Sequence, residues 1–323
     1  MKPKICKKCV LCENKPFIWL NEEKVCNICS EFDKTMQKKQ LLESEFFKLL
    51  NKHRGKGKYD CMVMCSGGKD SVMSLYLIKK KYKMNPLVFT FDHGFEDETA
   101  IKNIKNAVSA LNVDWLYYRT DYIQEAFQLI IKTNSKAPIC NVCALWYIQL
   151  AYKTAKQYKI PMIVAGWRKA QSNTGINSEY TQMSEATSKF IKNELRKISK
   201  YKNFPENTKQ AISVGKGIRM VSPHWFIDWK ESYKEILKNN LNWEPTKDSY
   251  PANSTNCRMN FVSTYLSMKN YGFTHYHIEK SKDIREGRIS RKEAINQLKI
   301  NFSRNKVKKI IKELECKINS KIS

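Results

Sequence analysis

The sequence predicts an α/β protein built on a doubly wound parallel sheet, with a small N-terminal cysteine module and a helical C-terminal region. Three observations support this fold class. Short apolar runs alternate with amphipathic stretches of helical length between about residues 59 and 166. A turn with two glycines joins the first apolar run to the first amphipathic stretch, and five of the eleven cysteines lie in the first 32 residues. Strands and helices that alternate at these lengths use right-handed crossovers and pair in parallel.

The chain divides into four expected regions. We expect a zinc-ribbon-like cysteine module over residues 1–34, a connecting helix over 35–56, an α/β domain over 57–228 and a helical, basic region over 229–323. A polar insertion at about 169–207 is expected near the functional site and partly mobile when that site is empty. The last 25 residues hold eight Lys or Arg against two Glu, which predicts a basic helix.

The individual elements follow from the apolar periodicity. Apolar runs predict four strands, at residues 59–65, 86–91, 113–118 and 161–166. Helical patterns lie at residues 35–52, 70–82, 98–111, 122–133, 141–158, 179–200, 229–241, 260–271 and 292–317. The apolar positions of the first helix are Leu41, Leu42, Phe46, Leu49 and Leu50. This face should pack on the α/β domain.

Composition places the chain among globular proteins, with 42% hydrophobic and 28% charged residues. No apolar stretch approaches the roughly 20 residues that cross a bilayer. The start, MKPKICKKC, lacks the apolar core of a secretion signal. We therefore expect a cytoplasmic protein without membrane insertion.

Charge indicates an anionic partner, because the 58 Lys and Arg residues exceed the 31 Asp and Glu residues by 27. Such an excess repels itself unless negative charge is near. A tRNA, an acidic carrier protein or a nucleotide-linked sugar would each fit, and a lysine-rich background composition explains the same excess. The charge thus selects the sign of the partner and not its identity. A homodimer is a further expectation.

The clearest motif is a hexapeptide between the first expected strand and its helix. It reads Ser66, Gly67, Gly68, Lys69, Asp70 and Ser71. Two glycines let backbone amides approach an anion closely, and the helix N-terminus adds positive potential. The two serines donate hydroxyls and Lys69 supplies a full charge. The motif is not a Walker loop, which requires GxxxxGK followed by Ser or Thr. A chance glycine turn is the alternative.

The hexapeptide SGGKDS matches in full the SGGxDS signature of the PP-loop family, which it resembles. That resemblance implies an adenine nucleotide alpha hydrolase-like fold and cleavage of ATP between the α and β phosphates. It implies that the loop grips the pyrophosphate portion and that Asp70 helps to hold magnesium. It further implies that adenine and ribose bind where the second strand ends, at Thr90, Asp92 and His93, and that Gly166 ends a later strand of the site. For Asp92 and His93 an ordinary turn at the strand end is the alternative.

The N-terminal cysteines have zinc spacing. Two CxxC pairs, Cys6 with Cys9 and Cys26 with Cys29, are separated by sixteen residues. Four thiolates around one zinc ion can fold a segment too small for its own core. Cys12 is left over, either as a substitute ligand or as a free thiol. A structural role is expected for this module, with docking of a substrate as a second possibility.

A second set of thiols comprises the CxxC pair Cys140 and Cys143, placed just before a predicted helix, and the distant Cys257. Both elements lead toward the open end of the sheet, so the three thiols could converge on a 4Fe-4S cluster. Some PP-loop sulfur-transfer enzymes have a similar CxxC with one distant cysteine. A persulfide-forming pair, a zinc site and ordinary buried cysteines are alternatives. Cys61 and Cys65 are expected in the core, and Cys316 is incidental.

Over nearly its whole length the sequence resembles the N-acetyl sugar amidotransferase branch of the PP-loop enzymes. The segments that carry this resemblance are CKKCVLCENKPFIWLNEEKVCNIC, YDCMVMCSGGKDS, NPLVFTFDHG and YHIEKSKDIREGRISRKEA. The resemblance implies conversion of an acetamido group to an acetamidino group, with ammonia from a glutaminase partner. Two features depart from that branch, the strand end AGWRKAQ and the thiol of Cys257.

Taken together, the expected reaction is ATP-dependent adenylation of an amide or carbonyl oxygen with release of pyrophosphate and then AMP. The expected catalytic residues are Lys69, Asp70, Cys140, Cys143 and Cys257. Sulfide from a sulfur donor would yield a thioamide or thiocarbonyl, whereas ammonia would yield an amidine. Sulfur is the favoured atom. A basic tRNA-binding module without catalysis is the weaker alternative.

Overall fold

The computed structural model describes residues 4–34, 43–171, 178–252, 254 and 256–320. Its centre is a sheet of five parallel strands in the order β3-β2-β1-β4-β5. The strands are β1 (Cys61–Met64), β2 (Pro86–Asp92), β3 (Asp114–Arg119), β4 (Met162–Val164) and β5 (Arg219–Val221). The chain runs outward from β1 through β2 to β3 and then returns to the other side of β1. The doubly wound α/β fold predicted from the sequence is confirmed.

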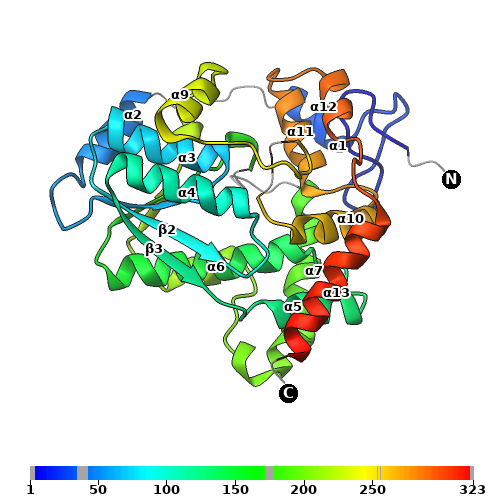
Figure 1. Cartoon of the computed structure of the whole chain (residues 1–323). Coiled ribbons are helices and arrows are strands. Elements are labelled where there is room, and N and C mark those ends of the chain that lie inside the picture. The colour runs from blue at the N-terminus through cyan, green and yellow to red at the C-terminus, as the bar shows by residue number, and fades with distance from the viewer. Residues whose placement is uncertain (1–3, 35–42, 172–177, 253, 255, 321–323) are drawn as a thin grey trace.

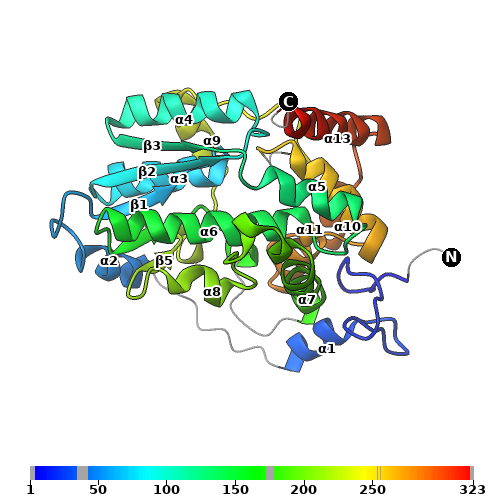
Figure 2. The ribbon, with the colours of Figure 1, turned by 90° about the horizontal axis from the view of Figure 1, so that it is seen from below.

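Alternating side chains of the central strands pack into two hydrophobic cores, one on each face of the sheet. Val63 and Val88 join the core that contains Phe46 and Leu237, whereas Met62 joins the core of the opposite face. Strands buried on both faces are typical of parallel sheets. Figure 2 shows the layers, with α4 on one side of the strands and α6 on the other.

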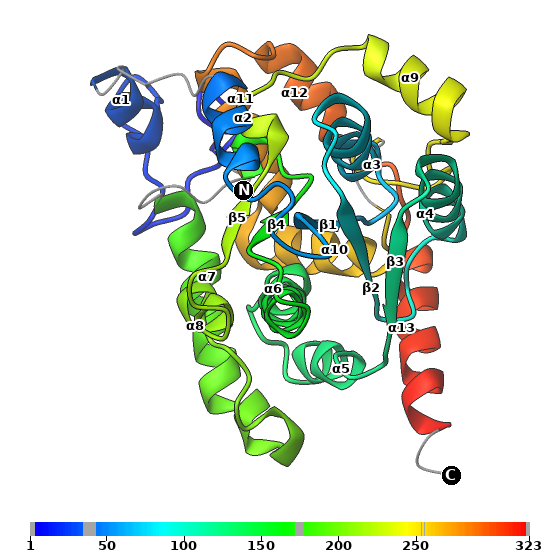
Figure 3. The same ribbon diagram turned by 90° about the vertical axis from the view of Figure 1, so that its left-hand side faces the viewer.

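The helices of the first face are α2 (Glu43–Asn51), α3 (Lys69–Tyr76) with the π-helical turn η1 (Leu77–Lys81), α4 (Glu98–Leu111) and α9 (Ser232–Leu241). The second face is covered by α5 (Gln124–Lys132) and α6 (Ile139–Gln157), with the short α8 (Thr208–Ser213) against α6. Figure 3 shows α5 and α6 together beneath the strands. Because α9 contacts both α3 and α4, the α/β layers include residues beyond 228.

The remaining helices lie beyond the carboxyl ends of the strands. They are α1 (Asn27–Lys34), α7 (Ser178–Asn193), α10 (Met259–Tyr271), α11 (His275–Arg285), α12 (Arg291–Gln297) and α13 (Arg304–Asn319). Short helical turns are η2 (Lys169–Gln171), η3 (Leu195–Lys197), η4 (Ser199–Tyr201) and η5 (Pro223–Trp225). The N-terminal module packs against this group through Met183, Tyr271 and Ile278 (Figure 1). The C-terminal region is therefore helical, as expected.

Several local predictions were wrong. The Cys140 and Cys143 pair lies inside the first turns of α6 and not before the helix, because the helix begins directly after Pro138. The expected helix over 292–317 is two helices, since Ser303 starts a new helix by capping α13. The strand β5 and the helix α11 were not predicted.

Two predictions concern residues that are not among those the structure describes. The apolar residues Leu41 and Leu42 and the first part of the connecting helix belong there, and so does the centre of the insertion at 172–177. Within the described part of the chain, no helix has the length and apolar character needed to cross a membrane.

Candidate functional site

The hexapeptide from Ser66 to Ser71 forms a closed turn between β1 and α3. Gly67 has a φ of +78°, and a Cβ there would lie 2.1 Å from the backbone oxygen of Ala100. The Ser71 hydroxyl accepts a hydrogen bond from the Ser66 amide (3.1 Å) and donates to the Gly68 carbonyl (3.0 Å). Only glycine fits this positive φ without both strain and collision. The loop is thus a rigid element whose shape depends on Gly67.

Side chains outside the loop also stabilise it, and they bind a carbonyl oxygen of the loop and not its amides. The Gly67 carbonyl accepts bonds from Asn103 Nδ2 (3.1 Å) and from Trp243 Nε1 (2.9 Å). At the N-terminus of α3, Gly68 is the cap residue and provides no side-chain hydrogen bond. The first amides of a helix need an outside partner, and an anion is a suitable one. Ser66 is exposed, so an anion can reach the loop from solvent.

Charged side chains surround the start of α3. Lys69 Nζ lies 2.9 Å from one carboxylate oxygen of Asp70, and Arg168 Nε lies 3.2 Å from the same oxygen. Burial opposes ionisation of Asp70, but the cations of Lys69 and Arg168 outweigh it and lower its pKa. Burial lowers the pKa of Lys69, an effect that Asp70 partly opposes. The site therefore holds two cations and one ionised carboxylate.

Magnesium requires oxygen ligands and is often held by one or two carboxylates together with substrate phosphates. Asp70 can supply one such carboxylate. In this structure, however, its Oδ2 contacts Lys69 and Arg168 while its Oδ1 accepts a bond from Arg168 NH2 (3.3 Å). Magnesium at Asp70 remains a prediction, and it requires the pair with Arg168 to open.

The loop after β4 lies at the topological switch point of the sheet, where the order of the strands reverses direction between β1 and β4. A Cβ at Gly166 would lie 2.6 Å from the backbone nitrogen of Ser71, so this loop lies directly against the phosphate loop. Two residues later Arg168 reaches Asp70. In open parallel sheets, ligands bind in the crevice where neighbouring strands lead the chain in opposite directions. Here that crevice lies between β1 and β4, and Gly166 is part of it.

The end of β2 is occupied mainly by contacts within the protein. Thr90 Oγ1 donates to the Cys65 carbonyl (2.8 Å) and accepts a bond from Trp115 Nε1 (3.0 Å). Asp92 accepts bonds from the Gly94 amide (2.6 Å) and from the Tyr117 hydroxyl. The structure thus gives these two side chains a local bonding role. Their part in nucleotide binding remains a prediction.

His93 points instead toward the second set of thiols. Its Nε2 lies 3.3 Å from Cys257 Sγ and 3.4 Å from a carboxylate oxygen of Glu96. Its Nδ1 is buried without a hydrogen-bond partner among the described residues. Burial lowers the pKa of His93 to about 4, so the ring is neutral near pH 7. A neutral imidazole nitrogen is a metal ligand or a hydrogen-bond acceptor.

The thiols of Cys140, Cys143 and Cys257 lie in one buried neighbourhood around Glu96. Burial raises the pKa of Cys140 to about 11, and the Glu96 charge adds to that rise. Burial also raises the pKa of Cys143 and Cys257 well above the usual value, and the thiols influence one another electrostatically. Reactive cysteines need the opposite, a lowered pKa. This environment disfavours a persulfide-forming pair unless a cation is bound.

The three sulfurs do not form a group whose members all lie within 4.8 Å of one another. A single zinc ion with sulfurs at about 2.3 Å would place tetrahedral sulfurs about 3.8 Å apart. One zinc ion held by these three thiols does not fit the structure. Cysteine thiolates are the ligands of 4Fe-4S clusters, so the three thiols are of the type that such a cluster requires. The cluster at these residues remains a prediction.

The second thiol set adjoins the phosphate loop through Asn256. The Asn256 side chain donates to Ser66 Oγ (3.2 Å), and a Cβ at Gly68 would lie 2.5 Å from it. Cys257, the next residue, pairs with Glu96 as an isolated antiparallel bridge. Backbone bonds from Asp97 to Asn256 (2.7 Å) and from Arg258 to Phe95 (2.8 Å) frame that bridge. The residue directly before Cys257 in the chain thus contacts the phosphate loop.

The N-terminal cysteines form a compact tetrad. The sulfurs of Cys6, Cys9, Cys26 and Cys29 are buried and all lie within 4.8 Å of one another. Cys9 Sγ and Cys26 Sγ are 3.7 Å apart, close to the spacing of about 3.8 Å expected around tetrahedral zinc. This donor set fits a structural zinc ion, which remains a prediction.

The other cysteines take no part in either group. Cys12 is buried beside the tetrad and its thiol contacts the Tyr271 carbonyl (3.6 Å). Cys61 and Cys65 are core residues, and Cys316 is exposed.

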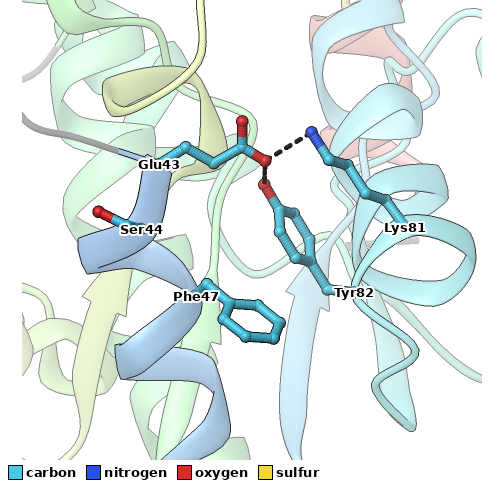
Figure 4. Close-up of a pocket in the computed structure, with 5 residues that line it drawn as sticks. All are labelled: Glu43, Ser44, Phe47, Lys81 and Tyr82. Atoms are coloured by element: carbon cyan, nitrogen blue, oxygen red, sulfur yellow. Dashed lines mark hydrogen bonds and ion pairs between the residues drawn. The ribbon is translucent and has the colours of Figure 1, made fainter.

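A surface hollow lies away from this site. Figure 4 shows it between α2 and the end of η1, with Phe47 on one side and Lys81 and Tyr82 on the other. Glu43 closes it by pairing with Lys81 (2.5 Å) and with the Tyr82 hydroxyl (2.8 Å). Lys81 is twelve residues beyond the start of α3, or about 18 Å along a helix. This hollow therefore belongs to the packing of α2 and not to the phosphate site.

A phosphate loop at the switch point of a parallel α/β sheet defines a nucleotide-binding protein. Residues 60–238 match the phosphoadenosine phosphosulfate reductase domain, more than half of the chain. The chain therefore belongs to that family, within the PP-loop superfamily.

A curated relative and several solved structures are similar to this chain. An uncharacterised protein of Methanocaldococcus jannaschii is 25% identical over 296 residues, which cover 90% of this chain and 92% of the relative. A U34-tRNA thiolase of Methanococcus maripaludis, solved with its 4Fe-4S cluster, is 16% identical over 89% of this chain and 87% of its own, with a TM-score of 0.38. An NMN synthetase of Francisella tularensis is 13% identical over 86% and 98%, with a TM-score of 0.40.

Some residues of the site were not singled out from the sequence. Arg168, Asn256 and Glu96 owe their positions to contacts across the fold, and no local pattern marks them. Glu279 on α11 accepts a bond from Gln171 (3.4 Å), whose own oxygen accepts a bond from the Arg168 amide (3.0 Å). The segment YHIEKSK that contains Glu279 was noted only as part of a resemblance. The local periodicity of this segment could not show that Glu279 lies close to Arg168, because that proximity depends on contacts between distant parts of the chain.

Proposed function

We propose that this protein adenylates an amide or carbonyl oxygen of an acidic acceptor and replaces that oxygen with sulfur. The observation that carries this proposal is the connection between the phosphate loop and the second thiol set through Asn256 and Cys257. Membership of the PP-loop superfamily supports the use of ATP. The thiols beside the loop support sulfur as the transferred atom.

The first step takes place at the phosphate loop. The acceptor oxygen attacks the α-phosphorus of ATP, a new oxygen–phosphorus bond forms, and the bond to pyrophosphate breaks. Lys69 and the first amides of α3 stabilise the negative charge that gathers on the departing pyrophosphate. Opening of the pair between Asp70 and Arg168 frees a carboxylate for magnesium and a guanidinium for phosphate.

In the second step a sulfur nucleophile attacks the activated carbon, and AMP leaves with the original oxygen. A sulfur donor must supply sulfide, because cysteines with raised pKa values are poor nucleophiles. Cys140, Cys143 and Cys257 would hold a 4Fe-4S cluster. When bound, such a cluster supplies an iron that no cysteine occupies and at which sulfide can be delivered.

Ammonia is the alternative nucleophile, and one observation favours it. One of the segments that resemble the N-acetyl sugar amidotransferase branch includes most of α11, and its Glu279 is linked to Arg168 through Gln171. In this reading the acceptor is an N-acetylated, nucleotide-linked sugar, and a glutaminase supplies ammonia. The product is then an acetamidino group.

The proposal is tested first by the nucleotide product. Protein purified without oxygen is incubated with ATP labelled in the α-phosphate and, separately, with bulk tRNA or nucleotide-linked N-acetyl sugars. We expect labelled AMP with equimolar pyrophosphate, formed only with the correct acceptor. Lys69→Met should slow AMP formation about 100-fold, as loss of one charge-stabilising donor does. Lys80→Met, at an exposed lysine of η1, is the matched control. Labelled ADP as the product would reject adenylation.

The transferred atom is tested by the nucleophile. Sulfide alone and ammonium alone are supplied in turn, and the acceptor is analysed by mass. Product formed with sulfide and lost in Cys257→Ser, but not in Cys316→Ser, supports sulfur transfer. Full activity of iron-free Cys257→Ser with ammonium would establish the amidotransferase alternative instead.

A further inference from the structure

Three different donor atoms converge at one end of the second thiol set. His93 Nε2, a carboxylate oxygen of Glu96 and Cys257 Sγ all lie within 4.8 Å of one another. They come from the turn after β2 and from the segment before α10, which the isolated bridge holds together. The side chains of His93 and Glu96 are only 3% and 14% exposed. The donors are therefore held in place by backbone contacts and shielded from solvent.

The carboxyl group of Glu96 lies in this cluster without a cationic side chain beside it among the described residues. No Lys or Arg of the described residues lies within ion-pair distance of Glu96, and its partner in the group is His93, at 3.4 Å. Burial disfavours an ionised carboxylate that has no cation beside it. The thiol of Cys257 would add a second negative charge on ionisation. A divalent cation would neutralise both groups.

We propose that His93, Glu96 and Cys257 bind a single divalent transition-metal ion, zinc or ferrous iron. One nitrogen, one oxygen and one sulfur ligand form the mixed donor set that ions of borderline softness accept. Three protein ligands leave one position of a tetrahedral ion free for an outside ligand, which distinguishes catalytic from structural sites. This site goes beyond the proposed function, because it needs neither Cys140 nor Cys143. It shares Cys257 with the proposed iron-sulfur cluster, so the single ion and the cluster are alternative occupants of that thiol.

The proposed ion lies near the phosphate loop, so its free coordination position could hold a reactant. Asn256, beside Cys257, contacts the first serine of the phosphate loop. An anionic nucleophile such as hydrosulfide, bound to this ion, would be held close to the phosphates of ATP. The ion would lower the pKa of the bound nucleophile and so keep it ionised, as zinc does for water.

The test is a metal titration of the full chain. Protein carrying zinc at the N-terminal tetrad and no other metal is titrated with Co²⁺, and bound cobalt is followed by absorption and equilibrium dialysis. We expect one equivalent of Co²⁺ and a sulfur-to-cobalt charge-transfer band. His93→Ala and Glu96→Gln should weaken binding about 100-fold, at least as much as loss of an outer-shell partner. Cys257→Ser should remove the charge-transfer band.

Two control variants separate this site from its neighbours. Glu98→Gln alters an exposed carboxylate two residues away and should bind Co²⁺ like the wild type. Cys140→Ser with Cys143→Ser removes two thiols of any cluster and should also retain the cobalt equivalent. The inference is overturned if Glu96→Gln binds cobalt as tightly as the wild type. It is overturned as well if the double variant loses the cobalt, since the ion would then lie on those thiols. Loss of an iron-sulfur cluster in the double variant with cobalt retained bears on the proposed function alone.

Discussion

The two cysteine groups of this chain differ in almost every physical respect. The tetrad of Cys6, Cys9, Cys26 and Cys29 is complete and compact, and Arg291 donates to the backbone oxygens of Cys9 (2.9 Å) and Cys6 (3.1 Å) around it. The second set is spread over two segments, adjoins the phosphate loop, and lies beside Glu96, a carboxylate without a Lys or Arg partner among the described residues. Closed metal sites stabilise a fold, whereas sites with a free position serve chemistry. The contrast leads us to expect a structural role for the first group and a chemical role for the second.

Removal of the tetrad metal should have the largest effect. Binding of zinc by four thiolates contributes on the order of 10 kcal/mol to the folding of a small module. Cys26→Ser should therefore unfold residues 4–34 and expose them to protease, as measured by limited digestion and calorimetry. Cys140→Ser with Cys143→Ser should cost only about 1 kcal/mol. Equal losses of stability in the two variants would break the contrast between the groups.

Two buried carboxylates sharpen the comparison. Glu179 lies near the tetrad and accepts a bond from Arg285 (2.8 Å), with both side chains almost fully buried. Glu179→Gln leaves a buried guanidinium poorly paired and should cost about 3 kcal/mol in urea unfolding. Glu96→Gln, measured with zinc at the tetrad and no other metal, should leave stability unchanged or raise it. A large loss in Glu96→Gln would mean that its carboxylate has a cationic partner after all.

The helix α11 connects the two regions and gives the smallest effect. Its Ile278 packs with the tetrad, whereas its Glu279 is linked to Arg168 at the phosphate loop. Burial, aided by the charge of Asp283, raises the pKa of Glu279 to about 7. The folded protein then holds this proton to higher pH than the unfolded chain does. Stability should consequently fall as pH rises from about 4.5 to about 7.

The check on this pH effect is a pair of thermal unfolding profiles. Glu279→Gln has no ionisation at this position, so its Tm should exceed that of the wild type at pH 8 and match it at pH 4.5. A constant difference between the two proteins over this range would contradict the raised pKa. Glu286→Gln, at the C-terminal cap of the same helix, where the carboxylate is partly exposed and pairs with Arg288, is the control.

The fold was largely predictable because its signals are local. Helix α4 begins and ends where its periodicity does, at Glu98 and Leu111. The strand β5 has three residues, too few for a pattern, and α11 buries polar residues such as Ser281 and Asp283, which hides its amphipathic face. The break between α12 and α13 did have a local signal, since Ser303 caps α13 by accepting a bond from the Lys306 amide.

The site was predictable only in part, because residue types are local and partners are not. SGGKDS located the phosphate loop, and the CxxC spacing located the tetrad. The sequence could not show that Arg168 pairs with Asp70, that His93 faces Cys257, or that Asn256 meets Ser66, since each contact joins distant segments. Pairings of this kind depend on how the whole chain closes around the sheet.

The short bridge between Glu96 and Cys257 is built from main-chain atoms alone. Side chains can therefore be exchanged at these two places without moving the path of either segment. A polypeptide with this framework could trade a carboxylate for an imidazole, or a thiol for a hydroxyl, and keep its distance to the nucleotide. In such a framework the main chain fixes the position of the reacting groups, and the side chains determine which reaction occurs there.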